Sequence, residues 1–330
     1  MGDQGLGRPA AEPGAHDAHD LGPQLQPALL SACGGCLCDV RWFRTDWQRG
    51  GAATGYGRFS ENGASRDVVI KLPVGPRELR VLTRLSACAA PTPRVVREGQ
   101  ELGGYDLGWV VMERLPGAPL SAALHHDVFD HLAQAAARFY ASAAEVMPLE
   151  PAKERYEWPA LLERSREALR TNQSVPHAAQ WAAAVKQTQH KLPTLLKIWN
   201  ARAINTWCHG DLHPGNCMER PAGSAWGEAG CVLLDFAEVH PGHWVEDAVY
   251  LERICWGRPK VLGDTKPVSL IAQARRAIGL DTSDDYGSLA NVRRILMAAT
   301  TPAFLGTEGH PAYLNAALEM LERLLPGVKT

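Results

Sequence analysis

The chain has 330 residues, of which 45% are hydrophobic and 21% charged, and its formal net charge at pH 7 is −2. This length exceeds what one small core needs and favours two lobes of unequal size. The composition is that of an ordinary globular protein, and the near-neutral charge gives no electrostatic reason to expect nucleic acid or an anionic membrane as a partner.

The N-terminal region carries no structural pattern. Residues 1–21 are rich in Gly, Pro and Ala without apolar periodicity, so we expect a disordered tail, followed by a short helix over 21–31. The N-terminus lacks the basic and then apolar pattern of a signal peptide, and no apolar run approaches the length that spans a bilayer. We therefore expect a cytoplasmic protein.

Eight cysteines are too few for a disulfide scaffold. Cys33, Cys36 and Cys38 form a CxxCxC cluster that could hold a metal, but no second ligand pair follows at the usual zinc spacing. The potential partners Cys208, Cys217 and His209 lie far along the chain. Reduced thiols are the interpretation that this spacing favours, with a zinc site as the alternative.

The region from 39 to 115 has the texture of a sheet. Aromatic and β-branched residues cluster in three predicted antiparallel strands around 40–47, 56–59 and 68–72, separated by turn-forming residues. A helix is predicted over 76–87, and two further strands near 94–98 and 107–114. These elements predict a small lobe, residues 22–115, made of about five strands and one helix.

Beyond Pro116-Gly117 the pattern becomes helical. Predicted helices cover residues 120–146, 158–169, 178–203, 244–257, 267–279, 287–300 and 311–325. Short strands are expected near 217–218 and 231–234. Strands first and helices afterwards predict an α+β fold in two lobes, with residues 116–330 as the larger, mostly helical lobe.

The most informative stretch reads CHGDLHPGN, residues 208–216, and is followed by VLLDF at 232–236. Phosphoryl transfer from ATP needs a carboxylate that orients the attacking hydroxyl and oxygen ligands that hold Mg²⁺ on the phosphates. Asp211 suits the first task, and Asn216 and Asp235 suit the second. The Asp-to-Asn spacing matches the HRDLxxxN pattern, and Asp235 falls where the DFG aspartate stands. Each residue alone could belong to an ordinary loop or strand end, but their order favours catalysis.

HGDLHPGN followed by LLDF resembles the aminoglycoside phosphotransferase and choline kinase superfamily, whose members phosphorylate hydroxyls of small molecules on a protein-kinase-like fold. The resemblance covers about residues 40–250, whereas 251–330 match no local motif. It implies ATP and Mg²⁺ as cofactors, a nucleotide in the cleft between the lobes, and a small-molecule hydroxyl as acceptor.

Further residues carry the resemblance in the small lobe. Lys71 ends the apolar, β-branched run Val68–Ile70, where an unpaired charge would be costly. The resemblance implies that its ammonium contacts the α- and β-phosphates and is held by Glu78. The alternatives are a lysine on an edge strand that reaches water, and a glutamate on a solvated helix face.

Two segments of the small lobe are candidates for nucleotide contacts. Residues 48–57, QRGGAATGYG, could cover the phosphates, because small residues let backbone N–H groups approach them and Thr54 could add a hydroxyl. A plain hairpin loop is the alternative. The resemblance also implies a hinge at 112–115, where backbone groups of Glu113 and Leu115 would pair with the adenine edge.

The resemblance assigns supporting roles around the catalytic loop. We expect His209 and His213 to brace the loop through backbone hydrogen bonds, because Pro214-Gly215 rules out the helix that a metal-binding pair would need. Asp247 resembles the family aspartate that hydrogen-bonds this loop, although Glu246 leaves the assignment open by one position. Gly210 replaces the HRD arginine that binds an activation-loop phosphate in protein kinases, which favours a constitutive enzyme.

These features predict an ATP- and Mg²⁺-dependent O-phosphotransferase that acts on a small molecule, held by the helices after Asp247 and by residues 120–170. The acceptor is left open. Residues 258–330 carry seven acidic and nine basic side chains, which does not indicate the carboxylate-lined pocket that aminoglycosides or choline would favour. Trp158, Trp244 and Trp256 could line a site or belong to the core. The preference for ATP over GTP and the oligomeric state are also left open.

Two other functions were weighed. A catalytically idle nucleotide-binding scaffold could keep the same fold. A protein kinase is the second alternative, but the absence of a glycine-rich signature, DFA in place of DFG, and the lack of an APE segment argue against it.

Overall fold

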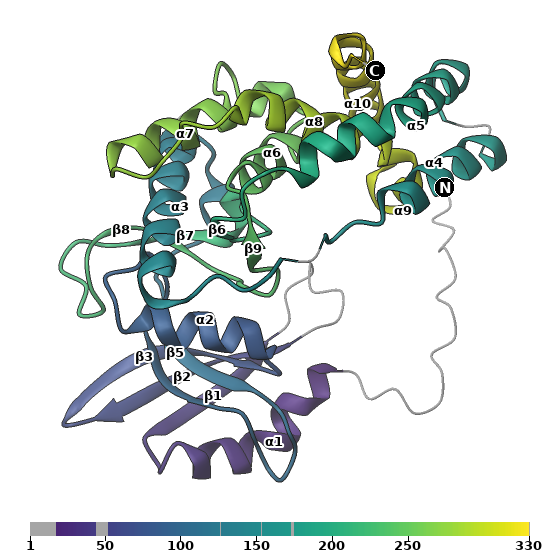
Figure 1. Ribbon diagram of the computed structural model, residues 1–330. Helices are drawn as coiled ribbons and strands as arrows, with labels where there is room; N and C mark the ends of the chain where they lie inside the picture. The colour runs from purple at the N-terminus through teal and green to yellow at the C-terminus, as the bar shows by residue number, and fades with distance from the viewer. Residues whose placement is uncertain (1–17, 44–51, 126, 153, 173–174, 330) are drawn as a thin grey trace. The chain divides into compact units, whose positions relative to one another are not determined.

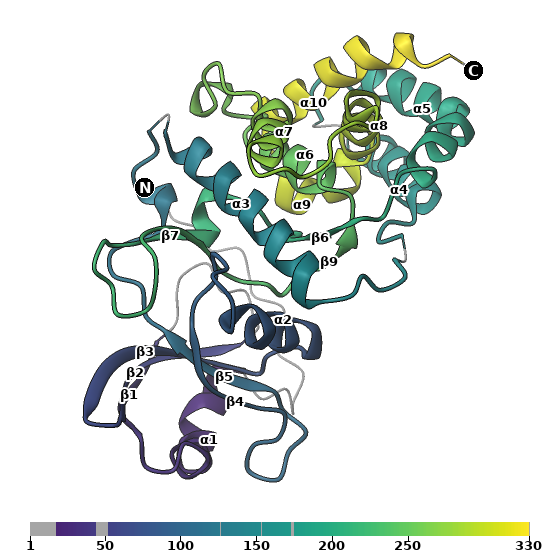
Figure 2. The ribbon, with the colours of Figure 1, turned by 60° about the vertical axis from the view of Figure 1, so that its left-hand side comes forward.

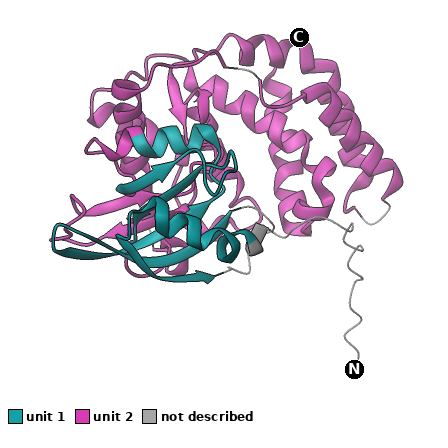
Figure 3. Ribbon diagram, turned by 90° about the horizontal axis from the view of Figure 1, so that it is seen from below, with its two compact units in different colours: residues 1–83, 94–114 teal, residues 84–93, 115–330 magenta. Residues whose placement is uncertain are grey.

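The computed structural model describes residues 18–43, 52–125, 127–152, 154–172 and 175–329. The chain forms two compact units, residues 1–83 with 94–114 and residues 84–93 with 115–330 (Figure 3). Most of the tail predicted to be disordered, residues 1–17, lies outside the described residues. The helix expected over 21–31 is present as α1, Ala18–Ala32, so the last residues of the predicted tail, from Ala18 on, are helical and not disordered.

The first unit is a five-stranded antiparallel sheet in the order β1-β2-β3-β5-β4. Helices α1 and α2 (Pro76–Ser86) lie on opposite faces of this sheet (Figures 1 and 2). The strands are β1 Leu37–Phe43, β2 Ala53–Glu61, β3 Ala64–Leu72, β4 Val95–Gly99 and β5 Trp109–Glu113. The predicted sheet and its helix are therefore confirmed.

Strand β3 is central, because it pairs with β2 on one side and β5 on the other. Val68, Ile70 and Leu72 alternate along it and are fully buried. Lys71 lies between them, points to α2, and is opposite Thr54 of β2 in the register. The alternative of an edge-strand lysine is excluded.

The predicted phosphate-covering loop is shorter than expected. Strand β2 begins at Ala53, so Thr54 to Gly57 belong to a strand, and residues 48–51 lie outside the described part of the chain. The small residues have a packing role: a Cβ on Gly55 would lie 3.0 Å from the Trp42 ring, and a Cβ on Gly57 would lie 3.0 Å from Leu37. A glycine-rich pattern here reflects close packing within the sheet.

The second unit is mainly helical and contains two small antiparallel sheets (Figure 1). One sheet pairs β6 (Thr206–Cys208) with β9 (His240–Gly242), and the other pairs β7 (Cys217–Arg220) with β8 (Gly230–Leu233). The helices are α3 Asp127–Val146, α4 Trp158–Thr171, α5 Ala178–Asn200, α6 Val245–Arg253, α7 Pro267–Ala277, α8 Tyr286–Ala299, α9 Leu305–Glu308 and α10 Pro311–Leu324.

A hydrophobic core of this unit lies among α4, α5, α8 and α10. Trp158, Trp181 and Trp199 are fully buried in it, and Trp256 packs at its edge. Trp244 is also buried. Trp158 and Trp244 are therefore core residues, whereas Trp256 belongs to the core and also lines a cavity with residues of α7, α8 and α10. None of the helices in the described part of the chain is long and apolar enough to cross a membrane.

Three details differ from the sequence-based expectation. The helix predicted over 120–146 begins at Asp127, because residues 120–122 form a separate 3₁₀ turn after Pro119. The helix predicted over 244–257 ends at Arg253. The β6–β9 pair was not predicted, since strands of three residues are too short to show alternation and β9 reads His-Pro-Gly.

Candidate active site

The catalytic loop, residues 209–216, connects β6 to β7, so that a different two-stranded sheet holds each end. Gly210 has a φ of 84°, and a Cβ at this position would lie 2.1 Å from the carbonyl oxygen of Glu238. Only glycine fits both the left-handed backbone and this close approach. The glycine that replaces the kinase arginine is therefore required by the local fold.

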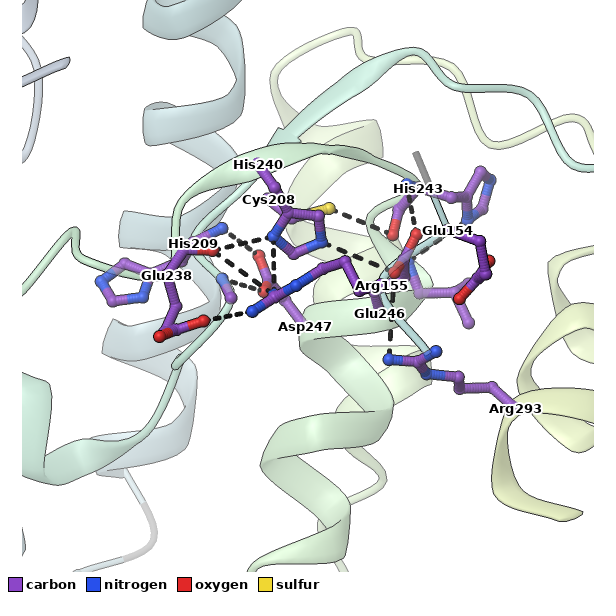
Figure 4. A network of polar contacts seen from close by, with 12 residues as sticks. Glu154, Arg155, Cys208, His209, Glu238, His240, His243, Glu246, Asp247 and Arg293 are labelled. Carbon is purple, nitrogen blue, oxygen red and sulfur yellow. Dashed lines mark hydrogen bonds and ion pairs between the residues drawn. The ribbon is translucent and has the colours of Figure 1, made fainter. Parts of the chain in front are cut away.

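Asp247, in the first turn of α6, holds the backbone of this loop (Figure 4). Its Oδ2 accepts hydrogen bonds from the His209 N–H at 2.7 Å and the Tyr140 hydroxyl at 2.9 Å, and its Oδ1 accepts the Gly210 N–H at 2.8 Å. The side chain is buried, so these contacts are sheltered from water. The predicted supporting role is confirmed for Asp247.

Glu246 serves a different purpose from its neighbour. Its Oε1 accepts the His243 N–H at 3.1 Å and forms an ion pair with Arg202 at 3.2 Å, while its Oε2 lies 3.5 Å from His240 and 3.9 Å from Arg293. Burial acts to raise the pKa of Glu246, but His240 and the two arginines outweigh it and hold that pKa below its usual range. The ionised carboxylate ties α6 to surrounding elements (Figure 4).

Within the described residues, Cys208, His240 and Glu246 form the one group of three possible metal ligands whose ligand atoms all lie within 4.8 Å of one another. Their chemistry does not favour a metal. Burial raises the pKa of the Cys208 thiol well above its usual value, and arginines already balance the Glu246 charge.

The CxxCxC cluster was the other metal candidate in the sequence. Cys33 is buried, and its burial raises the pKa of its thiol to about 11, which keeps it protonated at neutral pH. Cys38 is exposed on β1. A metal ligand must be a thiolate, so this environment favours ordinary reduced cysteines.

Both histidines of the loop brace it as predicted. The Nε2 of His209 lies 2.9 Å from the Leu234 carbonyl oxygen, and its Nδ1 accepts the Asp211 N–H at 3.3 Å. Burial lowers the pKa of His209, so the ring is neutral and carries its proton on Nε2. The Nδ1 of His213 accepts the Gly215 N–H at 3.0 Å.

The Asp211 carboxylate is held by three side chains. Asn216 donates from Nδ2 to its Oδ2 at 2.8 Å, the Tyr250 hydroxyl donates to its Oδ1, and His213 Nε2 lies 3.6 Å from the same oxygen. Burial acts to raise the pKa of Asp211, but these neighbours outweigh it and bring the pKa well below its usual range. Asp211 is therefore ionised at neutral pH and fixed in direction.

Tyr250 was not predicted from the sequence. It lies three residues after Asp247 on α6, so the two side chains share one face of the helix. Burial is the main cause that raises the pKa of Tyr250, and the Asp211 charge adds to it, so the hydroxyl is a permanent donor. The only signal in the sequence was this spacing from Asp247.

The other two candidate residues lie at one end of the β7–β8 hairpin. Asn216 immediately precedes β7, and the Leu234 N–H that follows β8 donates to the Asn216 carbonyl at 2.8 Å. Asp235 comes next and has a φ of 57°, a left-handed conformation that is uncommon outside glycine. The hairpin thus explains why residues nineteen positions apart in the chain are neighbours.

This end of the hairpin fits a magnesium ion. Asn216 uses its Nδ2 twice, on the carbonyl oxygen and on the carboxylate of Asp211, so the amide oxygen is the atom turned toward other ligands. An amide oxygen and the Asp235 carboxylate are the hard donors that Mg²⁺ prefers, alongside water and phosphate oxygens.

In the first unit, the expected ion pair is present. The Lys71 Nζ lies 2.6 Å from the Glu78 Oε1, and both side chains are largely buried. Thr54, on the neighbouring strand, is opposite Lys71. The structure therefore brings together the lysine, its glutamate and the threonine selected from the sequence.

Glu113 and Leu115 lie where the chain passes from one compact unit to the other, since the division falls after Arg114. The Glu113 N–H donates to the Arg94 carbonyl at 2.7 Å, and the Glu113 carboxylate accepts the Arg94 N–H at 3.1 Å. The Glu113 N–H is therefore engaged within the first unit.

The comparisons with known proteins show the family and the fold of the chain. The sequence model of the APH family, described as the phosphotransferase enzyme family, matches residues 61–289. This is more than half of the chain, so the chain belongs to the phosphotransferase enzyme family. No curated protein shows significant similarity to the chain by sequence.

Solved structures share the fold at low sequence identity. An aminoglycoside phosphotransferase from Alicyclobacillus acidocaldarius superposes with a TM-score of 0.58 at 14% identity, covering 92% of this chain and 94% of that one. The GDP and kanamycin complex of APH(2″) gives 0.53 at 16%, covering 92% and 99%. A microcompartment-associated aminopropanol kinase gives 0.56 at 14%, covering 88% and 94%. The predicted family and kinase-like α+β fold are confirmed.

The Asp247 contacts give a testable prediction. Replacing Asp247 with Ala leaves two backbone N–H groups and the Tyr140 hydroxyl without an acceptor, which should lower the free energy of unfolding by about 3 kcal/mol. Urea denaturation of the purified proteins measures this loss. Tyr140→Phe is the matched control, because it removes one donor only and should cost about 1 kcal/mol. Equal stability of Asp247→Ala and the unmodified protein would contradict the supporting role.

Proposed function

We propose that this protein is an ATP- and Mg²⁺-dependent phosphotransferase that moves the γ-phosphoryl group of ATP to a hydroxyl of a small molecule. The observation that carries the proposal is the held carboxylate of Asp211, with Asn216 bonded to it and Asp235 at the same end of the β7–β8 hairpin. Membership of the phosphotransferase family supports it. The GDP and kanamycin complex and the aminopropanol kinase among the fold relatives support nucleotide and small-molecule ligands.

Each of the two lobes predicted from the sequence has its own part in this proposal. Residues 22–115 bind the nucleotide: Lys71, held by Glu78, contacts the phosphates, and Thr54 lies opposite it in the sheet. The Glu113 carbonyl and the Leu115 N–H pair with the adenine. Residues 116–330 carry the catalytic loop and hold the acceptor.

Asn216 and Asp235 would hold the magnesium ion, which neutralises charge on the phosphate oxygens when it is bound. Asp211 accepts a hydrogen bond from the acceptor hydroxyl and so points that oxygen at the phosphorus. Its low pKa makes it a weak base, so it takes the proton late, after most of the transfer to phosphorus has occurred. Orientation is therefore the main contribution of Asp211.

The central test is Asp211→Ala. The variant should lose about 10²- to 10⁴-fold in kcat for acceptor phosphorylation, because the hydroxyl is no longer oriented, while the Kd for ATP changes little. Coupled ADP release over a panel of aminoglycosides, amino alcohols, sugars and hydroxy acids measures kcat, and calorimetry measures the Kd for ATP. Asp264→Ala, an exposed aspartate outside the loop, is the control. Turnover retained in Asp211→Ala would refute its role, and ATP binding without turnover by the unmodified protein would favour the idle scaffold.

A second test concerns the metal. Asp235→Ala should reduce the affinity for ATP in the presence of Mg²⁺ to the level seen with a chelator, because a carboxylate ligand of the ion is lost. ATP titrations with Mg²⁺ and with EDTA, on both proteins, give this comparison. If Mg²⁺ still strengthens ATP binding to the variant as much as to the unmodified protein, Asp235 is not a metal ligand.

A third test separates Tyr250 from the catalytic aspartate. Tyr250→Phe removes the donor to Asp211 and keeps the ring, so the pKa of Asp211 should rise toward its ordinary value. Because Asp211 acts in its ionised form, the acidic limb of the kcat profile should move to higher pH, and kcat at neutral pH should fall roughly fivefold. A pH–rate profile with an unchanged acidic limb would show that Tyr250 does not position Asp211.

A further inference from the structure

A cavity of about 540 Å³ lies in the second unit, and its wall includes Tyr250, the tyrosine that donates a hydrogen bond to Asp211. Its wall comes from α6, the turn that follows α6, the end of α9 and the start of α10. The side chains that matter for recognition are Tyr250, Arg253, Arg258, Glu308, His310 and Tyr313. Tyr250 belongs both to this wall and to the catalytic site, because its hydroxyl donates to Asp211. Tyr250 therefore stands between a molecule in the cavity and the carboxylate of Asp211.

The charges of this wall are mostly positive. Arg253 and Arg258 are its two arginines, and Glu308 is the only carboxylate among its described lining residues, while the Nδ1 of His310 accepts the Ala312 N–H at the start of α10. Glu308 already forms an ion pair with Arg253. Arg258 is exposed and has no carboxylate partner among the residues that the structure describes. One arginine charge in the wall is therefore left unbalanced.

Two polar atoms of the wall also lack hydrogen-bond partners. The Nε of Arg253 and the Oε2 of Glu308 are both buried without a partner. Both atoms are shielded from solvent, so a ligand in the cavity does not reach them, and they bear on stability rather than on recognition. The rings of Tyr250 and Tyr313 leave apolar surface in the cavity for a carbon skeleton.

We propose that this cavity is the acceptor site and that it selects hydroxyl compounds bearing an anionic group, a carboxylate or a phosphate, which Arg258 binds. The word acceptor rests on the phosphotransferase function proposed above. Polycationic acceptors are disfavoured, because the single carboxylate of the wall is already neutralised and Arg258 repels an ammonium group. The acceptor class thus differs from the aminoglycosides after which related proteins are named.

The test uses two series of compounds that share a carbon skeleton and differ in charge. One is glycerol, glycerate, glycerol 3-phosphate and 3-amino-1,2-propanediol. The other is glucose, gluconate, glucose 6-phosphate and glucosamine. ADP release gives kcat/KM, and thermal shift without nucleotide gives binding independently of catalysis. We expect the carboxylate or phosphate member of at least one series to exceed its neutral counterpart, and the amine to be the poorest. Comparison of the carboxylate compound with the phosphate compound in each series shows which anion the site binds better.

Substitutions at Arg258 test whether this residue causes the preference for anionic compounds. Arg258→Ala and Arg258→Glu should lower kcat/KM for the anionic compound roughly 10- to 100-fold, as expected for the loss of a charged hydrogen bond, and leave the neutral one nearly unchanged. Lys260→Ala is the matched control, because it removes the same charge two residues away, outside the cavity wall, and should behave like the unmodified protein.

The outcomes separate this inference from the proposed reaction. The inference is overturned if neutral or cationic compounds give the higher kcat/KM, or if the order of the compounds is the same in Arg258→Glu. In either case, ADP release would still support the phosphotransferase function. Thermal stabilisation by anions that depends on Arg258, without any ADP release, upholds the cavity assignment and overturns the reaction. If the protein shows no ADP release and no thermal stabilisation that depends on Arg258, the inference is overturned.

Discussion

The hydrogen bonds of Asp247 with the catalytic loop are the constraint on which the site depends. Two backbone N–H groups and a tyrosine hydroxyl converge on one buried carboxylate, which fixes the start of the loop against helix α6. Gly210 then turns the chain in a left-handed conformation, and Asp211 emerges in a set direction. The same helix supplies Tyr250 and Arg253, so α6 carries the support of the loop, the partner of Asp211 and part of the cavity wall.

The sequence predicted those features of the fold and the site that depend on residues close together in the chain or at a fixed spacing from one another. Asp211 and Asn216 belong to one short loop, and Lys71 needed a partner because it ends an apolar run, which Glu78 supplies at 2.6 Å. Hydrophobic alternation and helical texture located most strands and helices. Thr54 shows the limit, because a glycine-rich stretch reads as a loop until the packing of Trp42 and Leu37 against those glycines is known.

What the sequence did not predict comes from residues that distant segments bring together. The β6–β9 pair joins two three-residue strands separated by more than thirty residues, and no periodicity survives at that length. The cavity combines α6 with α9 and α10, from a region without a recognisable motif. Counting charges over 258–330 could not show that Glu308 is already paired with Arg253 while Arg258 is left over. Recognition of the acceptor is therefore a tertiary property.

Under the proposed function, the hydrogen bond between Tyr250 and Asp211 affects the hydrolysis of ATP when no acceptor is bound. A kinase that holds ATP without an acceptor risks transferring the phosphoryl group to water. Here one oxygen of the aspartate is occupied by a tyrosine hydroxyl, which cannot itself ionise near neutral pH. In the proposed reaction, a hydroxyl that approaches Asp211 meets one carboxylate oxygen already bonded to Tyr250 and the other bonded to Asn216, so its approach is confined to the remaining lone pairs. Under the proposed function, this confinement would favour an alcohol held in the cavity over a freely diffusing water molecule, and so would limit hydrolysis of ATP.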